Sequence, residues 1–88
     1  MKLPFQEKHI EDNVYIRIFS ENEDSGDFTW HRDEEDRFIE PLHETDWKIQ
    51  IDNELPKEIK DKVFIAKEVY HRLIKGSGDL KIKLYKQK

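Results

Sequence analysis

Residues 56–75, with the sequence PKEIKDKVFIAKEVYHRLIK, decide the fold class of this chain. Their apolar side chains fall close to the spacing of one helix face, and Pro56 suits the first position of a helix. Gly76 suits its C-terminal cap, so periodicity alone favours an amphipathic helix. However, residues 63–65 and 69–74 are rich in β-branched and aromatic side chains, which favour strands. The residues by themselves leave both interpretations open.

The two interpretations differ in what His71 can do. His31 and Asp33 are two residues apart, so on a strand their side chains project from the same face. Only a strand at His71 places its imidazole naturally opposite that face. Two histidines and one carboxylate, with further positions left open, form the ligand set that non-haem Fe(II) and related divalent metals prefer. The spacing therefore indicates a metal site, on condition that residues 56–75 are extended.

Outside this segment, the chain reads as short strands separated by turns. Residues 14–19 alternate, with Val14, Ile16 and Ile18 on one face, and residues 47–52 alternate in the same way. The first thirteen residues can add an edge strand. Three further segments show the β pattern: 28–33, 37–39 and 80–85. Turn-forming residues cluster between these strands: 20–27, 34–36, 42–46, 52–54 and 76–79. This order is typical of an all-β sandwich or barrel.

The length and composition predict one folded domain. At 88 residues, the chain is near the size at which a single core suffices without cross-links. Charged residues make up 41% of the chain and apolar residues 35%, but the 11% of aromatic residues and the alternating segments argue against disorder. The chain has no cysteine, so neither a disulfide nor a thiolate metal site is available.

The charge and hydropathy limit the expected partners. A net charge of −4 disfavours general binding to nucleic acids. No apolar run approaches the length that spans a membrane, and the start of the chain lacks the apolar segment of a signal peptide. We therefore expect a cytoplasmic protein that acts on neither a membrane nor a nucleic acid.

The order of the pieces resembles the layout of small single-domain cupins. The pieces are the stretch Trp-His-Arg-Asp at 30–33, a turn, the strand at 47–52, and Phe-Ile-Ala-Lys-Glu-Val-Tyr-His-Arg at 64–72. In that family, a His-x-His motif with a following glutamate lies in the first half of a jelly-roll barrel, and a histidine in the second half completes a metal site. The resemblance covers residues 14–84. It implies an all-β jelly-roll barrel with little or no helix, in one domain over 1–88 with its core at 14–85.

The resemblance also implies a metal site. By position, His31 matches the first motif histidine, Asp33 the second, and His71 the histidine of the later motif. Such a set binds a divalent Fe, Mn, Ni or Zn ion. Asp33 replaces a histidine, as in the His-x-Asp…His set of cupin-related oxygenases, and Arg37 stands near the position of the family's glutamate. The alternative is a metal-free polar pocket, in which Asp33 pairs with Arg37 or Arg32.

Three further residues are candidates for ligand contacts. Arg37 can bind a carboxylate or phosphate through its planar guanidinium, unless it forms a salt bridge with Asp33 or Asp36. Gln50 would contact a ligand if the polar face of its strand lines the barrel, and it would face outward otherwise. Tyr70 lies next to the candidate metal ligand of the second half, where it would either rim the pocket mouth or pack in the core.

Two functions of different classes follow from these patterns. The first is a cupin-like protein that binds a small anionic ligand, with or without a metal, and carries out oxygenase or isomerase chemistry if it is an enzyme. The second is a non-catalytic binding or interaction protein with a metal-free pocket, whose acidic residues 21–27 meet a basic partner. The cupin resemblance further implies a homodimer, because cupins often associate through edge strands.

Overall fold

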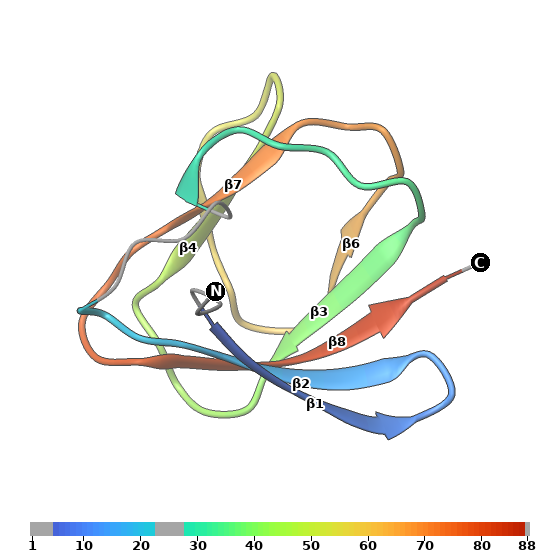
Figure 1. Ribbon diagram of the computed structural model, residues 1–88. Coiled ribbons are helices and arrows are strands. Elements are labelled where there is room, and N and C mark those ends of the chain that lie inside the picture. Colours follow the sequence, from blue (N-terminus) through green and yellow to red (C-terminus); the bar gives the residue numbers. More distant parts are fainter. Residues whose placement is uncertain (1–4, 23–27, 88) are drawn as a thin grey trace.

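Eight short strands form two antiparallel sheets that face each other as a small barrel (Figure 1). The computed structural model describes residues 5–22 and 28–87. One sheet has five strands in the order β1-β2-β8-β3-β6, and the other has three in the order β5-β4-β7. The strands are β1 (Phe5–Glu11), β2 (Val14–Phe19), β3 (Arg37–Pro41), β4 (Lys48–Ile51), β5 (Lys57–Glu58), β6 (Val63–Ile65), β7 (His71–Ile74) and β8 (Leu80–Lys86).

Residues 56–75 form three short strands, so the prediction of one amphipathic helix is wrong. β5 pairs with β4, β6 pairs with β3, and β7 pairs with β4. β6 buries Val63 and Ile65 and β7 buries Leu73, whereas the two residues of β5 are exposed. The all-β prediction is confirmed, since the described elements are all strands. No helix in the described part of the chain is long and apolar enough to cross a membrane.

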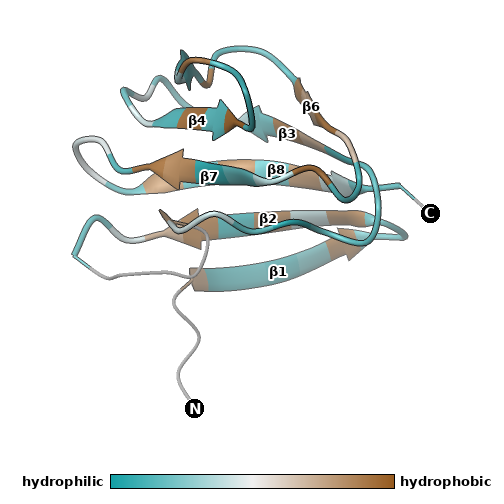
Figure 2. Ribbon diagram, turned by 90° about the horizontal axis from the view of Figure 1, so that it is seen from above, coloured by the Kyte–Doolittle hydropathy of each residue, from teal (hydrophilic) through white to brown (hydrophobic). Residues whose placement is uncertain are grey.

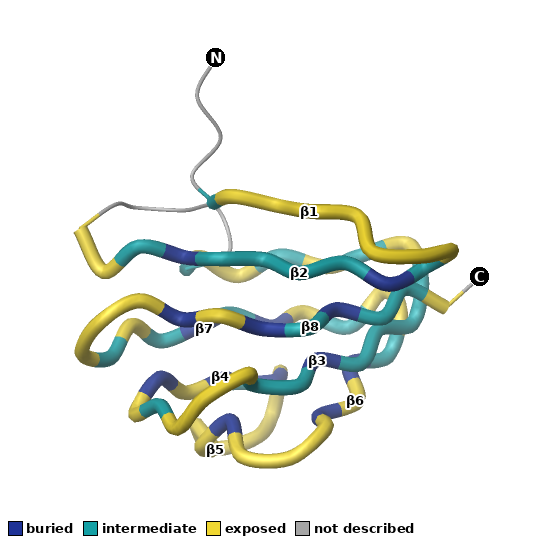
Figure 3. Tube along the Cα trace, turned by 90° about the horizontal axis from the view of Figure 1, so that it is seen from below, coloured by how far each residue is buried: buried dark blue, intermediate teal, exposed yellow. Residues whose placement is uncertain are grey.

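The hydrophobic core lies between the two sheets. Figure 2 shows apolar and polar residues alternating along the strands, and Figure 3 shows buried and exposed residues alternating in the same way along β8. In β4, the apolar residues face inward, which is one of the two orientations that the alternation of residues 47–52 allows. The core contains Phe19, Ile39, Trp47, Ile49, Ile59, Val63, Ile65, Leu73, Leu80, Ile82 and Leu84.

β2 turns its aliphatic face outward and a charged residue inward. Arg17 lies opposite the buried Ile82 of β8, whereas Ile16 lies opposite Lys83 on the outer face. The predicted edge strand β1 completes this arrangement, because Glu7 lies opposite Arg17 and pairs with it. The hairpin of β1 and β2 therefore brings one guanidinium into the barrel.

Residues 28–33 are not the regular strand that their alternation predicts. The structure has a single bridge there, between His31 and His71, with backbone N···O distances of 3.0 and 2.8 Å. Trp30, on the opposite side of the segment, is 43% exposed. The segment is thus an irregular connection beside β7 that alternates its side chains only from Trp30 to Asp33, since Phe28 packs against the core and Thr29 is exposed.

The turn between β7 and β8 is fixed by the carboxylate of Asp46. A Cβ atom on Gly76 would lie 2.7 Å from the backbone nitrogen of Trp47, so this position has no room for a side chain. The next residue, Ser77, donates its backbone N–H to Oδ1 of Asp46 at 2.7 Å. Gly76 therefore serves a close approach in a turn between strands and not the cap of a helix.

Replacing Asp46 by asparagine is expected to destabilise the protein at neutral pH but not in acid. The hydrogen bonds from Ser77 lower the pKa of Asp46 below its usual value of 3.8. A carboxylate with a lowered pKa contributes stability above the unfolded-state pKa and loses it as the pH falls through the folded-state pKa. The difference between wild type and Asp46→Asn should be measured by urea unfolding at several pH values. A difference that does not change with pH, or an equal one in the exposed Asp52→Asn, would contradict this assignment.

Candidate metal centre

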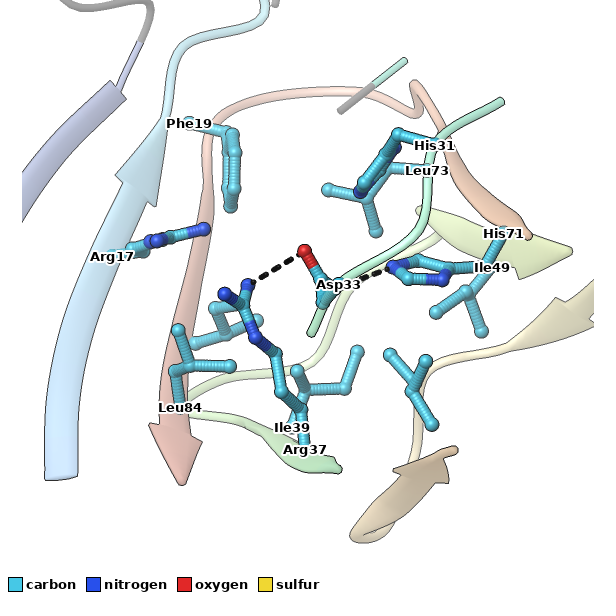
Figure 4. A pocket seen from close by; sticks show the side chains of 12 residues that line it. Arg17, Phe19, His31, Asp33, Arg37, Ile39, Ile49, His71, Leu73 and Leu84 are labelled. Atoms are coloured by element: carbon cyan, nitrogen blue, oxygen red, sulfur yellow. Dashed lines mark ion pairs between the residues drawn. The ribbon is translucent and has the colours of Figure 1, made fainter. Parts of the chain in front are cut away.

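His31, Asp33 and His71 meet inside the barrel, as the sequence predicts for an extended segment 56–75. Each offers one ligand atom, and the three atoms lie within 4.8 Å of one another. His31 and Asp33 come from the irregular segment before β3, and His71 is the first residue of β7. Figure 4 shows the carboxylate of Asp33 between the imidazole of His71 and the guanidinium of Arg37. The His71 residue is 5% exposed.

Backbone carbonyls orient both histidines. Nδ1 of His31 lies 2.9 Å from the carbonyl oxygen of Thr29, and Nδ1 of His71 lies 2.9 Å from that of Val69. A carbonyl oxygen can only accept a hydrogen bond, so each Nδ1 carries the hydrogen and the lone pair of a neutral ring is on Nε2. A histidine held in this way by its second nitrogen is typical of metal ligands in proteins.

One oxygen of Asp33 is buried without a hydrogen bond. Oδ2 has no hydrogen-bond partner among the described residues, although it lies 3.1 Å from Nε2 of His71. The 3.1 Å contact therefore has the distance of an ion pair without the angles of a good hydrogen bond. Two atoms with lone pairs stay this close only if a proton or a metal ion lies between them, because they repel each other otherwise. Either a proton on Nε2 of His71 or a metal ion between the two atoms would satisfy this oxygen.

The electrostatics keep Asp33 ionised. Burial alone raises the pKa of the Asp33 carboxyl, but its contact with His71 and the positive charge of Arg37 outweigh burial and hold the pKa below its usual value. Oδ1 of Asp33 lies 3.4 Å from a terminal nitrogen of Arg37, which is one of the salt bridges that the sequence suggests. A carboxylate that stays ionised is the form that binds a metal.

Arg37 is held by a second acidic residue. Its Nε donates to Oε1 of Glu35 at 2.8 Å, and one terminal nitrogen lies 2.7 Å from the same oxygen. The salt bridge suggested with Asp36 is not formed, because the Asp36 carboxylate accepts the backbone N–H of Lys67 instead. Arg37 does line the pocket, but two carboxylates already engage its guanidinium.

The pocket has a polar wall and an apolar floor. Its cavity measures about 30 Å³, which is room for about two water molecules at ~10–15 Å³ each. Arg17 is the charged residue of the pocket that the sequence did not predict, because the alternation of β2 does not tell which face is inside. The lining residues are Arg17, Phe19, His31, Asp33, Arg37, Ile39, Ile49, Ile65, His71, Leu73, Ile82 and Leu84.

The structure does not bring Gln50 and Tyr70 to this pocket. The side chain of Gln50 lies on the outer face of β4, where its oxygen accepts two hydrogen bonds from Arg72 at 3.0 and 2.9 Å. Tyr70 is 45% exposed and lies near the guanidinium of Arg32, so it is neither a core residue nor a residue of the pocket lining. The prediction that these two residues contact a ligand in this pocket is therefore wrong. The apolar face of β4 points inward and leaves Gln50 outside. The chain turns Tyr70 away from its neighbour His71.

Other candidate ligands lie outside the cluster. Glu40, close to the position of the family's glutamate, accepts a hydrogen bond from the hydroxyl of Tyr85 at 3.1 Å on the outer face. Both ring nitrogens of the exposed His43 have partners, namely the carbonyl oxygen of Glu44 and the backbone N–H of Lys81. The set at the centre is therefore two histidines and one aspartate, without a fourth protein ligand among the described residues.

The comparisons with known proteins show the fold. No family model matches the sequence, and no curated protein is similar to it. A cupin domain from Bordetella pertussis superposes with a TM-score of 0.63 at 14% identity, over 100% of this chain and 99% of that one. A cupin-2 domain protein from Shewanella frigidimarina gives 0.61 at 16% identity, over 91% of this chain and 76% of that one. FeII HppE gives 0.60 at 16% identity, over 84% of this chain and 41% of that one.

The chain has the jelly-roll fold of the small cupins, with a His-Asp-His cluster in its interior. The resemblance drawn from the sequence is confirmed at the level of the fold.

Proposed function

We propose that this protein binds a divalent transition-metal ion at His31, Asp33 and His71 and takes a small anionic ligand beside it. The observation that carries the proposal is Oδ2 of Asp33, which is buried without a hydrogen bond at 3.1 Å from Nε2 of His71. A cation that binds to both atoms removes their repulsion and satisfies the oxygen.

The donor set supports Fe, Mn, Ni or Zn. Imidazole nitrogens and a carboxylate oxygen suit these divalent ions, and no thiolate is present to favour a softer one. The similarity to FeII HppE agrees with this choice. When bound, the metal would polarise a ligand oxygen or activate water or O₂, which are the chemistries of metal-dependent isomerases and oxygenases.

Other residues of the chain would orient the three ligand side chains and set the electrostatics of the site. The carbonyls of Thr29 and Val69 hold the two imidazoles, and Arg37 holds Oδ1 of Asp33 so that Oδ2 faces His71. The apolar side chains of the floor lower the local polarity, which strengthens the charge interactions in the pocket. The pocket is small, so the ligand that reaches the metal is small as well.

The second candidate function is a metal-free binding pocket. Asp33 contacts both His71 and Arg37, so a proton on Nε2 of His71 would complete a chain of two cations and one carboxylate. Such a chain would be a structural network in a non-catalytic binding protein. The acidic segment 21–27, which the sequence analysis assigned to a basic partner, lies largely outside the described residues. A homodimer, through the exposed edge strand β1, and a cytoplasmic location stay predictions.

Metal analysis separates the two functions. Chelator-treated protein dialysed against Fe(II), Mn(II), Ni(II) or Zn(II) is expected to retain about one ion per chain with at least one of these metals. His31→Ala and His71→Ala should each lose this metal. His9→Ala is the matched control, because the exposed His9 also bonds to a backbone carbonyl but lies outside the cluster. Wild-type protein that is fully stable and retains none of these metals would exclude the metal centre.

A further inference from the structure

Arg17 is the charged residue of the pocket that the metal centre does not use. Its side chain is 11% exposed, its Nε lies 2.5 Å from Oε2 of Glu7, and its guanidinium lies 4.2 Å from the centre of the Phe5 ring. It points into the pocket from β2, on the side opposite His71 (Figure 4). Its two terminal nitrogens have no hydrogen-bond or ion-pair partner among the described residues.

This arrangement leaves a fixed set of donors that lacks an acceptor. The bond to Glu7 and the stacking on Phe5 set the plane of the guanidinium. The terminal nitrogens are not among the fully buried atoms without a partner, so they are open to water or to a ligand that enters the pocket. Arg37 differs in this respect, because Glu35 and Asp33 already engage it. Of the two arginines, Arg17 is therefore the one that is able to bind a ligand.

The charge around the pocket points to the order of binding. The two guanidiniums of Arg17 and Arg37 face the three carboxylates of Glu7, Asp33 and Glu35, which with neutral histidines gives a net charge of −1. This charge attracts a cation first. A divalent ion changes the net charge to +1, which a ligand with a single negative charge would neutralise.

We propose that Arg17 anchors the carboxylate group of a small monocarboxylate ligand beside the metal, an inference that rests on the proposed metal centre. A planar carboxylate pairs with the parallel N–H groups of a guanidinium. A tetrahedral oxyanion can pair with them too, but its additional oxygens need more room than this small cavity offers. The cavity of about 30 Å³ admits a group of a few atoms and excludes a larger acid from the interior. Glu7 competes with this ligand for Arg17.

The test uses the protein loaded with Co(II) and titrated with acetate, while the visible bands of Co(II) report ligand entry. Arg17→Met is expected to weaken acetate binding about tenfold or more, since it removes a charged pair of hydrogen bonds. Arg17→Lys should restore part of the acetate affinity and leave the Co(II) affinity little changed. Arg17→Met makes the pocket more negative, so it should not weaken Co(II) binding. Arg72→Met is the control, because Arg72 stacks on Trp30 outside the pocket. Sulfate is titrated in parallel, and it should bind more weakly than acetate.

Glu7→Gln is expected to change the acetate affinity in the opposite direction. Loss of the competing carboxylate is expected to tighten acetate binding, whereas a purely structural pair would only lose stability. If Arg17→Met does not fold, Arg17→Lys and Glu7→Gln carry the test. The inference is overturned if acetate binds equally well to wild type and the Arg17 variants, if Glu7→Gln weakens binding, or if sulfate is preferred. Failure of wild type to bind Co(II) would instead refute the proposed metal centre, and this inference with it.

Discussion

Asp33→Ala is expected to bind a divalent metal about a hundredfold or more weakly than wild type while it stays folded. Residues that merely orient a metal ligand already contribute about 10- to 100-fold to affinity, and Asp33 is the single anionic ligand of the set. Folding should persist because Arg37 keeps its contacts with Glu35 when Asp33 is removed. Isothermal titration with the metal that wild type retains measures the change.

Glu35→Gln is the matched control for this substitution. Like Asp33, Glu35 pairs with Arg37, but it is not in the group of possible ligands. Its replacement should therefore change metal affinity much less than Asp33→Ala. Equal losses in the two variants would show that the metal depends on the position of Arg37 and not on coordination by Asp33.

Trp47→Ala is expected to destabilise the protein by about 3–5 kcal/mol, which is the largest expected effect of a core substitution. Trp47 is 0% exposed and packs against Phe19 and Phe28, with ring centres 6.4 and 5.6 Å away. Its Nε1 also donates to the carbonyl of Gly78 at 2.9 Å, so the indole links the core to the turn before β8. Small domains have a low free energy of unfolding, so Trp47→Ala would be largely unfolded in mild denaturant.

Trp47→Phe separates packing from the hydrogen bond. Phenylalanine keeps most of the apolar volume but has no donor for Gly78, so a loss of about 1–2 kcal/mol is expected. Urea unfolding followed by circular dichroism measures both variants. Similar losses in Trp47→Phe and Trp47→Ala would show that the bond to the turn, and not the packing, accounts for the stability.

The sequence predicted the strand segments better than the faces that the strands present to the core. Alternation placed Val14, Ile16 and Ile18 on one face of a strand over residues 14–19, and that strand is confirmed. It did not predict that Arg17 faces inward, because alternation only groups residues into two sets. The inward set is chosen by β1, whose Glu7 pairs with Arg17, and by the partner residues of β8. Both are contacts between segments that are distant in the sequence.

Two segments show where local pattern and tertiary structure disagree. The apolar residues of 56–75 fit a helix and three strands about equally well, and the available edges of β3 and β4 decide for strands. Residues 28–33 alternate as a strand does, yet only His31 forms a bridge. The extended backbone was nevertheless enough to keep His31 and Asp33 on one side.

The candidate metal ligands could be predicted from their spacing in the sequence, but the hydrogen bonds around them could not. Two residues in an extended segment and one in a later strand were sufficient to bring His31, Asp33 and His71 together. The carbonyl bonds that fix the imidazoles and the unbonded Oδ2 of Asp33 depend on distances that no sequence pattern contains. Spacing does not tell which face of a strand points inward either. Gln50 was therefore predicted to contact a ligand, although its side chain lies on the outer face of β4.

The pair of backbone hydrogen bonds between His31 and His71 has a consequence for the kinetics of metal exchange. These bonds join residues that are distant in the chain, and they use backbone atoms rather than the side-chain atoms that would bind a metal. The entropy of bringing the ligands together is therefore lost during folding, and an arriving ion does not have to order the chain again. We expect metal to enter and leave a preorganised site at a rate far above that of global unfolding, with almost no change in the backbone.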